Sequence, residues 1–138
     1  MTNEFSHTID AKGRLFIPAQ LRKELGEVMY ICKGLGGCVF VYSEENWRKF
    51  EDRINDLPIS QTIEIQRAIF TTACRCEPDA QGRILLSQKL REYGELEKNV
   101  MVNGVGNHAE IWNKEKWEAA EAKRNAISME SYMDQLGF

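Results

Sequence analysis

The 138-residue sequence lacks any run of about 18 apolar residues, the length that a membrane-spanning helix requires. Its first residues, Met1 to Phe5, also lack the basic and apolar regions of a secretory signal peptide. These two absences predict a protein that has no membrane partner and works in the cytoplasm. The hydrophobic fraction of 43% and the charged fraction of 28% are typical of a soluble globular protein.

Residues that bind metals or act as nucleophiles are few. They are His7 and His108, together with Cys32, Cys38, Cys74 and Cys76. The cysteine spacings, C-x5-C and C-x-C, are not those of a zinc finger or ribbon, and in a reducing cytoplasm we expect free thiols. Neither histidine has an obvious nucleophilic partner nearby in sequence, and the glycine-rich stretch 34–37 lacks the Lys-Ser/Thr pair of a phosphate-binding loop. The sequence therefore predicts no metal, no cofactor and no enzymatic activity.

An overall excess of basic residues is also absent. Lysine and arginine number 18 against 21 aspartates and glutamates, so the net charge is −3. This balance argues mildly against a nucleic-acid partner, but binding depends on a local basic patch rather than on total charge. Residues 1–26 contain four basic and three acidic side chains, so their net charge is +1. Residues 44–56 contain three basic and five acidic side chains, so their net charge is −2. The acidity therefore lies in a predicted helix and not in the first 26 residues.

An internal repeat organises the chain. The segment Asp10–Arg22, D-A-K-G-R-L-F-I-P-A-Q-L-R, aligns with Asp79–Arg91, D-A-Q-G-R-I-L-L-S-Q-K-L-R, and six of the thirteen pairs are identical. After a one-residue insertion the match continues, and Trp47 meets Trp117. Two copies are too few for a solenoid, which needs about three. We therefore expect a pseudo-twofold domain whose halves cover each other.

The repeat divides the chain into four predicted parts. These are a first β-rich module at 4–47, a helical linker at 48–74, a second module at 75–118 and a helical tail at 119–138. In the first copy we expect a short strand at 7–9, a turn, a strand at 15–17 and a short helix that Gly26 ends. Two apolar strands follow at 28–32 and 38–42.

Helical periodicity begins after these strands. Ser43 is a good N-cap for a helix at 44–56, and Ser60 is a candidate cap for a second helix. The apolar residues of the first helix follow a helical period, which favours a stripe that faces the core. This stripe contains Trp47, Phe50, Ile54 and Leu57. By its equivalent place in the second copy, Trp117 is also expected in the core.

The repeated D-x-x-x-R turn has two possible roles. In a purely structural role, Asp10 pairs with Arg14 and Gly13 adopts the positive φ that the turn needs. In a nucleic-acid-binding role, the planar guanidinium of Arg14 contacts phosphate or guanine, Lys12 adds a mobile charge, and Asp10 orients the arginine. The spacing alone favours the structural role, and repetition does not decide between them.

The two motifs, their order and their spacing resemble the duplicated signature of the MraZ family, from about residue 4 to residue 118. The resemblance implies an α+β, mostly β fold: a duplicated SpoVT/AbrB-like swapped-hairpin barrel with short helices. It also implies a cytoplasmic, nucleoid-associated transcription factor that forms ring-like homo-oligomers. Such a protein binds short direct repeats in the promoter of the division and cell-wall gene cluster.

The resemblance makes Arg14 the best candidate for contact with double-stranded DNA, and Arg83 is its counterpart. The predicted DNA-binding residues are Lys12, Arg14, Arg22 and Arg83, and the residues that form or orient the turns are Asp10, Gly13, Asp79 and Gly82. The second turn departs from the first, because Gln81 replaces Lys12 and Ser87 stands where the first copy has Pro18. The second turn is therefore less basic, and the first is expected to matter more. The alternative function is an antitoxin-type module whose main partner is another protein.

Overall fold

The computed structural model describes all 138 residues. Its strands are β1 (Glu4–Thr8), β2 (Arg14–Phe16), β3 (Met29–Lys33), β4 (Val39–Ser43), β5 (Cys74–Cys76), β6 (Arg83–Leu85), β7 (Asn99–Val105) and β8 (His108–Asn113). Its α-helices are α1 (Ala19–Leu25), α2 (Glu44–Asn55), α3 (Ile59–Phe70), α4 (Gln88–Tyr93), α5 (Lys114–Asn125) and α6 (Met129–Gln135). The predicted α+β class is confirmed, although helical residues outnumber strand residues. None of these helices is both long and apolar enough to cross a membrane.

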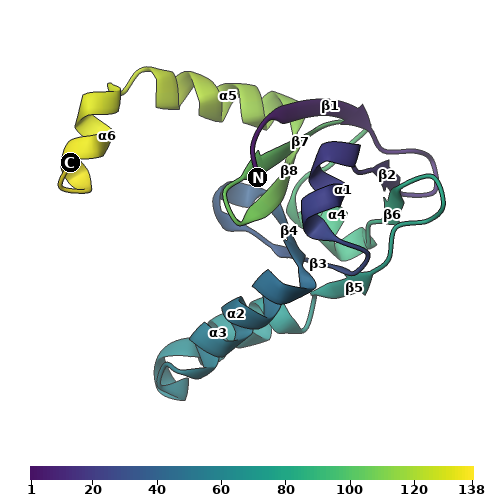
Figure 1. Cartoon of the computed structure of the whole chain (residues 1–138), viewed down its shortest axis with the longest axis horizontal. Helices are drawn as coiled ribbons and strands as arrows, with labels where there is room; N and C mark the ends of the chain where they lie inside the picture. The colour runs from purple at the N-terminus through teal and green to yellow at the C-terminus, as the bar shows by residue number, and fades with distance from the viewer.

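The strands of the two copies are interleaved. Six of them form an antiparallel sheet in the order β1-β7-β8-β4-β3-β5, and β2 pairs with β6 in a separate two-stranded ribbon (Figure 1). The sheet has free edges at β1 and β5, so the closed swapped-hairpin barrel is not confirmed. Each edge strand is contributed by one copy and pairs with a strand of the other, since β1 lies on β7 and β5 lies on β3.

One hydrophobic core serves both copies. It contains sixteen buried residues, and its members include equivalent pairs such as Leu15 with Ile84 and Leu21 with Leu90. The three apolar residues that follow each turn arginine therefore alternate as a strand requires, with the first and third side chains buried. Because the core crosses the boundary between the copies, the halves cover each other as predicted.

Helix ends follow local sequence signals. The Ser43 hydroxyl accepts a hydrogen bond from the Asn46 backbone N–H, which confirms the predicted cap of α2. Asn113 caps α5 in the same way, by accepting from the Lys116 N–H. Gly26 ends α1 with φ 82°, as expected for a residue without a Cβ.

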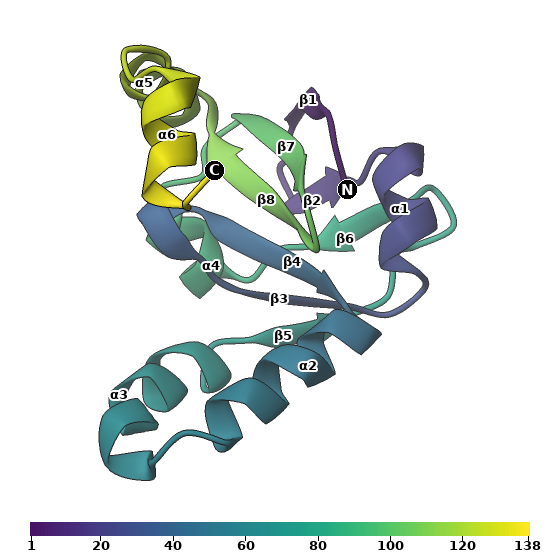
Figure 2. The ribbon, with the colours of Figure 1, turned by 60° about the vertical axis from the view of Figure 1, so that its left-hand side comes forward.

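Two predictions about the helices were wrong. Ser60 does not cap α3, because the helix already begins at Ile59 and Pro58 is the last residue with extended backbone. The predicted core stripe of α2 holds for Trp47 but not for Leu57, of which 48% is exposed. Figure 2 shows the reason: α2 and α3 run away from the sheet, so only the start of α2 lies over the strands.

Trp117 is only half buried, unlike Trp47. Trp47 is enclosed by aromatic rings from its own helix, from the sheet and from α3, including Phe50 and Phe70. In α5, Ala120 occupies the place of Phe50, and α6 does not fold back on α5 as α3 folds back on α2 (Figure 1). The prediction that Trp117 is a core residue is therefore only partly correct.

Candidate nucleic-acid interface

The first repeated turn is closed by a single carboxylate. Oδ1 of Asp10 accepts hydrogen bonds from the backbone N–H groups of Lys12 and Arg14, both at 2.9 Å. Oδ2 of Asp10 accepts from Nε of Arg14 at 2.7 Å. Gly13 has φ 81°, which a residue with a side chain rarely adopts. The sequence therefore encodes this turn through contacts that span at most four residues.

The second turn repeats the first. Asp79 accepts from the backbone N–H groups of Gln81 and Arg83 and from Nε of Arg83, all at 2.9 Å. Gly82 has φ 79°. Asp10, Gly13, Asp79 and Gly82 therefore occupy equivalent positions in two turns of the same geometry.

The two turn arginines remain available for a ligand even though each pairs with an aspartate. Only Nε is engaged in each pair, so both terminal nitrogens of Arg14 and of Arg83 make no hydrogen bond within the protein. About a third of each side chain is exposed, 33% for Arg14 and 29% for Arg83. The aspartate thus fixes the direction of the guanidinium while leaving its outer edge free, and the structural and ligand-binding roles of the turn are compatible.

The β2–β6 ribbon brings the two arginines together. Its antiparallel register places Arg14 opposite Leu85, Leu15 opposite Ile84, and Phe16 opposite Arg83. Side chains alternate along a strand, and Leu15 and Ile84 face the core. Arg14 and Arg83 therefore share the outward face, at diagonal positions, and diagonal neighbours in such a ladder are about 7–8 Å apart. Both arginines are recognisable in the sequence, but the strand pairing that joins them is not.

The electrostatics of the turns favour ionised aspartates. The backbone N–H of Arg14 is the main cause that lowers the pKa of Asp10 below 3.8, and its side chain adds to the effect. The backbone N–H of Arg83 likewise lowers the pKa of Asp79. Both carboxylates therefore stay charged at neutral pH and hold their arginines.

An Asp10→Asn variant is expected to separate the carboxylate charge from the backbone contacts. The variant keeps an oxygen that accepts from the two N–H groups but loses the charge that holds Arg14. Because folding lowers the pKa of Asp10, the charge stabilises the protein fully above pH 3.8 and ceases to do so as the pH falls through the folded value. Thermal unfolding should therefore show a less stable variant at pH 7 and convergence with the wild type in acid. A deficit that is the same at both pH values would contradict this account, and Asp79→Asn should show the same pH dependence because its contacts and lowered pKa match those of Asp10.

The other predicted contact residues are placed differently. Lys12 is exposed at the first turn and forms no ion pair. Arg22 is half buried, donates from Nε to the Ile17 carbonyl at 2.8 Å, and lies over the Phe16 ring at 5.1 Å. Its role in binding DNA stays a prediction. Arg91 is the counterpart of Arg22 in the repeat and was not among the predicted contact residues, although the alignment of the two copies pairs these arginines.

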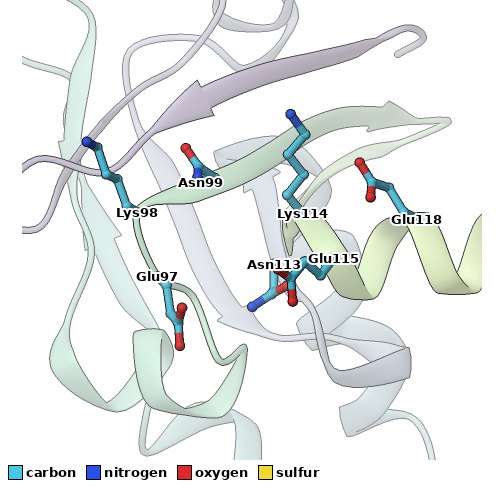
Figure 3. Close-up of a pocket in the computed structure, with 7 residues that line it drawn as sticks. All are labelled: Glu97, Lys98, Asn99, Asn113, Lys114, Glu115 and Glu118. Atoms are coloured by element: carbon cyan, nitrogen blue, oxygen red, sulfur yellow. The ribbon is translucent and has the colours of Figure 1, made fainter.

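The protein also contains a polar surface depression and four cysteine thiols. Figure 3 shows a polar depression in which the charged ends of its side chains point in different directions, and which has no apolar residue in its lining. Burial raises the pKa of the Cys32 thiol to about 12, so this thiol is not a thiolate nucleophile at neutral pH. The four cysteines are free, and no group of three or more His, Cys, Asp or Glu side chains is arranged to hold a metal ion.

Comparison with known proteins agrees with the duplicated architecture. The family model described as "MraZ protein, putative antitoxin-like" matches residues 1–65 and 69–136. The protein named Transcriptional regulator MraZ from Heliobacterium modesticaldum is 44% identical over 135 residues, which cover 96% of this chain and 94% of that protein. A protein of the same name from a Thermoanaerobacter species is 45% identical, over 99% of this chain and 96% of that protein. Another, from Carboxydothermus hydrogenoformans, is 47% identical, over 83% of this chain and 81% of that protein. The chain therefore belongs to the MraZ family.

Proposed function

We propose that the protein is a sequence-specific DNA-binding transcriptional regulator that reads DNA with the β2–β6 ribbon. The observation that carries this proposal is the position of Arg14 and Arg83 on one outward face, each held by an aspartate with its terminal nitrogens free. A two-stranded ribbon fits the major groove, where arginine contacts guanine with two parallel hydrogen bonds. The names of the curated relatives, all transcriptional regulators, support the same function.

The two turns have unequal parts in this proposal. Lys12 gives the first turn a second, exposed positive charge that can contact phosphate, whereas Gln81 is neutral at the equivalent position. Arg14 therefore makes the dominant contact and Arg83 a supporting one. The resemblance to the family adds the target: short direct repeats in the promoter of the division and cell-wall gene cluster, bound in the cytoplasm by a nucleoid-associated oligomer.

Assembly into an oligomer has a candidate interface. A groove of about 470 Å³ between the sheet and α3 is lined mainly by apolar side chains, which include Phe40, Phe50, Ile65 and Ile69. No residue of α6 lines this groove in the same chain, and α6 has exposed apolar residues of its own. These are Met129, Met133 and Leu136.

The groove of one subunit and α6 of a neighbouring subunit have complementary surfaces. The α6 segment carries Glu130 and Asp134, and the groove is bordered by Lys33, so opposite charges accompany the apolar surfaces. We assign α6 of a neighbouring subunit as the occupant of the groove. Because the groove and α6 are different surfaces, the contact runs head to tail and forms a ring if the rotation closes.

Replacing Arg14 with alanine tests the DNA interface. The loss of one bidentate base contact should weaken specific binding by about 1–3 kcal/mol per engaged subunit, or roughly 5- to 150-fold. Fluorescence anisotropy with the promoter repeats measures the affinity, and thermal unfolding checks that the variant still folds. Arg83→Ala should have the smaller effect. Lys123→Ala, which removes an equal charge from the exposed surface of α5, is the control.

The outcome also separates this function from the antitoxin-type alternative. In that alternative the apolar groove holds a different protein, and the ribbon arginines contribute nothing to DNA affinity. An Arg14→Ala variant that folds, assembles and binds the promoter like the wild type would exclude the ribbon as the DNA-reading surface. A steep fall of wild-type affinity with salt is expected in addition, because phosphate contacts release counterions.

A further inference from the structure

Two arginines outside the turns each lie against the turn of the opposite copy. A Cβ placed on Gly82 of the second turn would be 2.6 Å from Cζ of Arg22, which belongs to α1 of the first copy. A Cβ on Gly13 of the first turn would be 3.3 Å from Cζ of Arg91, which belongs to α4 of the second copy. The arginines are thus exchanged between the copies, and each guanidinium lies close against the turn glycine of the opposite copy.

Each of these arginines also donates a hydrogen bond to a residue whose own backbone N–H is bonded to the opposite turn. Nε of Arg22 donates to the Ile17 carbonyl at 2.8 Å, and the Ile17 N–H donates to the Gly82 carbonyl at 2.9 Å. Two consecutive hydrogen bonds therefore connect the Arg22 guanidinium, through Ile17, to the second turn. Arg22 is additionally held over the Phe16 ring at 5.1 Å.

The second copy repeats this arrangement with one fewer contact. Nε of Arg91 donates to the Leu86 carbonyl at 3.2 Å, and the Leu86 N–H donates to the Gly13 carbonyl at 2.9 Å. Leu85 stands at the position equivalent to Phe16, so Arg91 has no aromatic ring beneath it. The contact between Arg91 and the first turn therefore depends more on the guanidinium than the contact between Arg22 and the second turn does.

We propose that Arg22 and Arg91 are positioning residues, and that each fixes the turn of the opposite copy on the β2–β6 ribbon. The aspartates close each turn internally, but they do not determine where one turn lies relative to the other. Arg91 fixes the turn that carries Arg14, and Arg22 fixes the turn that carries Arg83. For Arg22 this role replaces the direct contact with DNA that the sequence predicts. The consequence for DNA binding rests on the function proposed above, whereas the ordering of the turns does not.

The chemistry requires arginine rather than a positive charge alone. The guanidinium is planar, so it can lie flat against the glycine peptide while Nε donates to the carbonyl. A lysine ammonium keeps the charge but has neither the planar surface nor the Nε donor. A residue that served DNA only through its charge on phosphate would tolerate lysine.

The experiment measures hydrogen exchange of the turn amides in the full-length protein without DNA. In Arg91→Lys, exchange at Gly13 and Arg14 should become at least about tenfold faster, because one hydrogen bond from a charged donor contributes that factor or more. Exchange at Gly82 and Arg83 should stay as in the wild type. Arg22→Lys should show the opposite pattern, and Lys89→Ala, which changes an exposed cation of α4, is the control. Unchanged exchange at the opposite turn in both lysine variants would overturn the proposal.

DNA affinity provides the second readout. If Arg91 positions the first turn, Arg91→Lys should lose about as much promoter affinity as Arg91→Ala. If Arg91 instead contacts phosphate, Arg91→Lys should bind the promoter like the wild type. In Arg91→Ala the slope of log affinity against log salt concentration should then be smaller by about one. These two results would overturn the positioning role. A change in exchange without any change in DNA affinity would keep the ordering role and count against the ribbon as the DNA-binding surface.

The contact between Arg22 and Gly82 allows a test by double-mutant cycle. Gly82→Ala should destabilise the wild type through both backbone strain and the approach of its Cβ to Arg22. In the Arg22→Ala background only the strain remains, so the same substitution should be less destabilising. Additive effects of the two substitutions would contradict the contact.

Discussion

Replacing Trp47 with alanine is expected to lower the free energy of unfolding by about 3–5 kcal/mol, the usual cost of truncating a buried aromatic side chain. Only 5% of Trp47 is exposed. Its ring is stacked on Tyr30 at 5.1 Å and meets the edge of Phe70 at 5.8 Å. Trp47 therefore joins α2, α3 and the sheet, and chemical denaturation monitored by circular dichroism measures its contribution.

The equivalent Trp117→Ala substitution should cost clearly less and serves as the matched control. Trp117 is half buried, packs against Trp112 at 5.4 Å, lies below the Arg124 guanidinium at 4.5 Å, and donates to Glu4 at 3.2 Å. Neither tryptophan lies on the outward face of the ribbon. Variants that keep the stability of the wild type but lose DNA affinity would show that these rings stack on nucleic acid instead.

Preventing assembly is expected to weaken binding to an array of promoter repeats by about 10²–10⁴-fold, while binding to a single repeat changes little. Linked subunits make each later contact intramolecular, so their combined affinity exceeds that of one subunit by about this factor. A single subunit has a net charge of −3 and few basic residues near the ribbon. Identical contacts made in one rotational sense fit direct repeats spaced by about one helical turn, or roughly 10 bp.

Met133→Asp is the variant for this experiment, because it places a charge within the exposed apolar surface of α6. Ser131→Asp adds the same charge to α6 without altering an apolar residue and is the control. Native mass spectrometry determines the number of subunits, and titration against one repeat and against several determines the affinities. Equal, tight binding of one and several repeats by a monomeric variant would remove avidity from the mechanism, and a variant that still assembles would exclude α6 as the contact.

The sequence alone determined those features that depend on neighbouring residues. The D-x-x-x-R turn needs an aspartate four residues before the arginine and a glycine with positive φ, and every bond that closes it lies within that span. The Ser43 cap of α2 and the Gly26 end of α1 are equally local. The duplication was visible for the same reason, since each copy repeats the local signals in the same order.

Only the tertiary structure decided which segments of the two copies meet. The pairing of β2 with β6 and the contacts of Arg22 and Arg91 with the opposite turns join residues 60 to 78 positions apart. Their geometry depends on a core built from both copies. The different burial of Trp47 and Trp117 has a similar origin. Both follow the same local pattern, but α3 packs against its own copy and α6 does not, so long-range packing rather than periodicity decides which ring is buried.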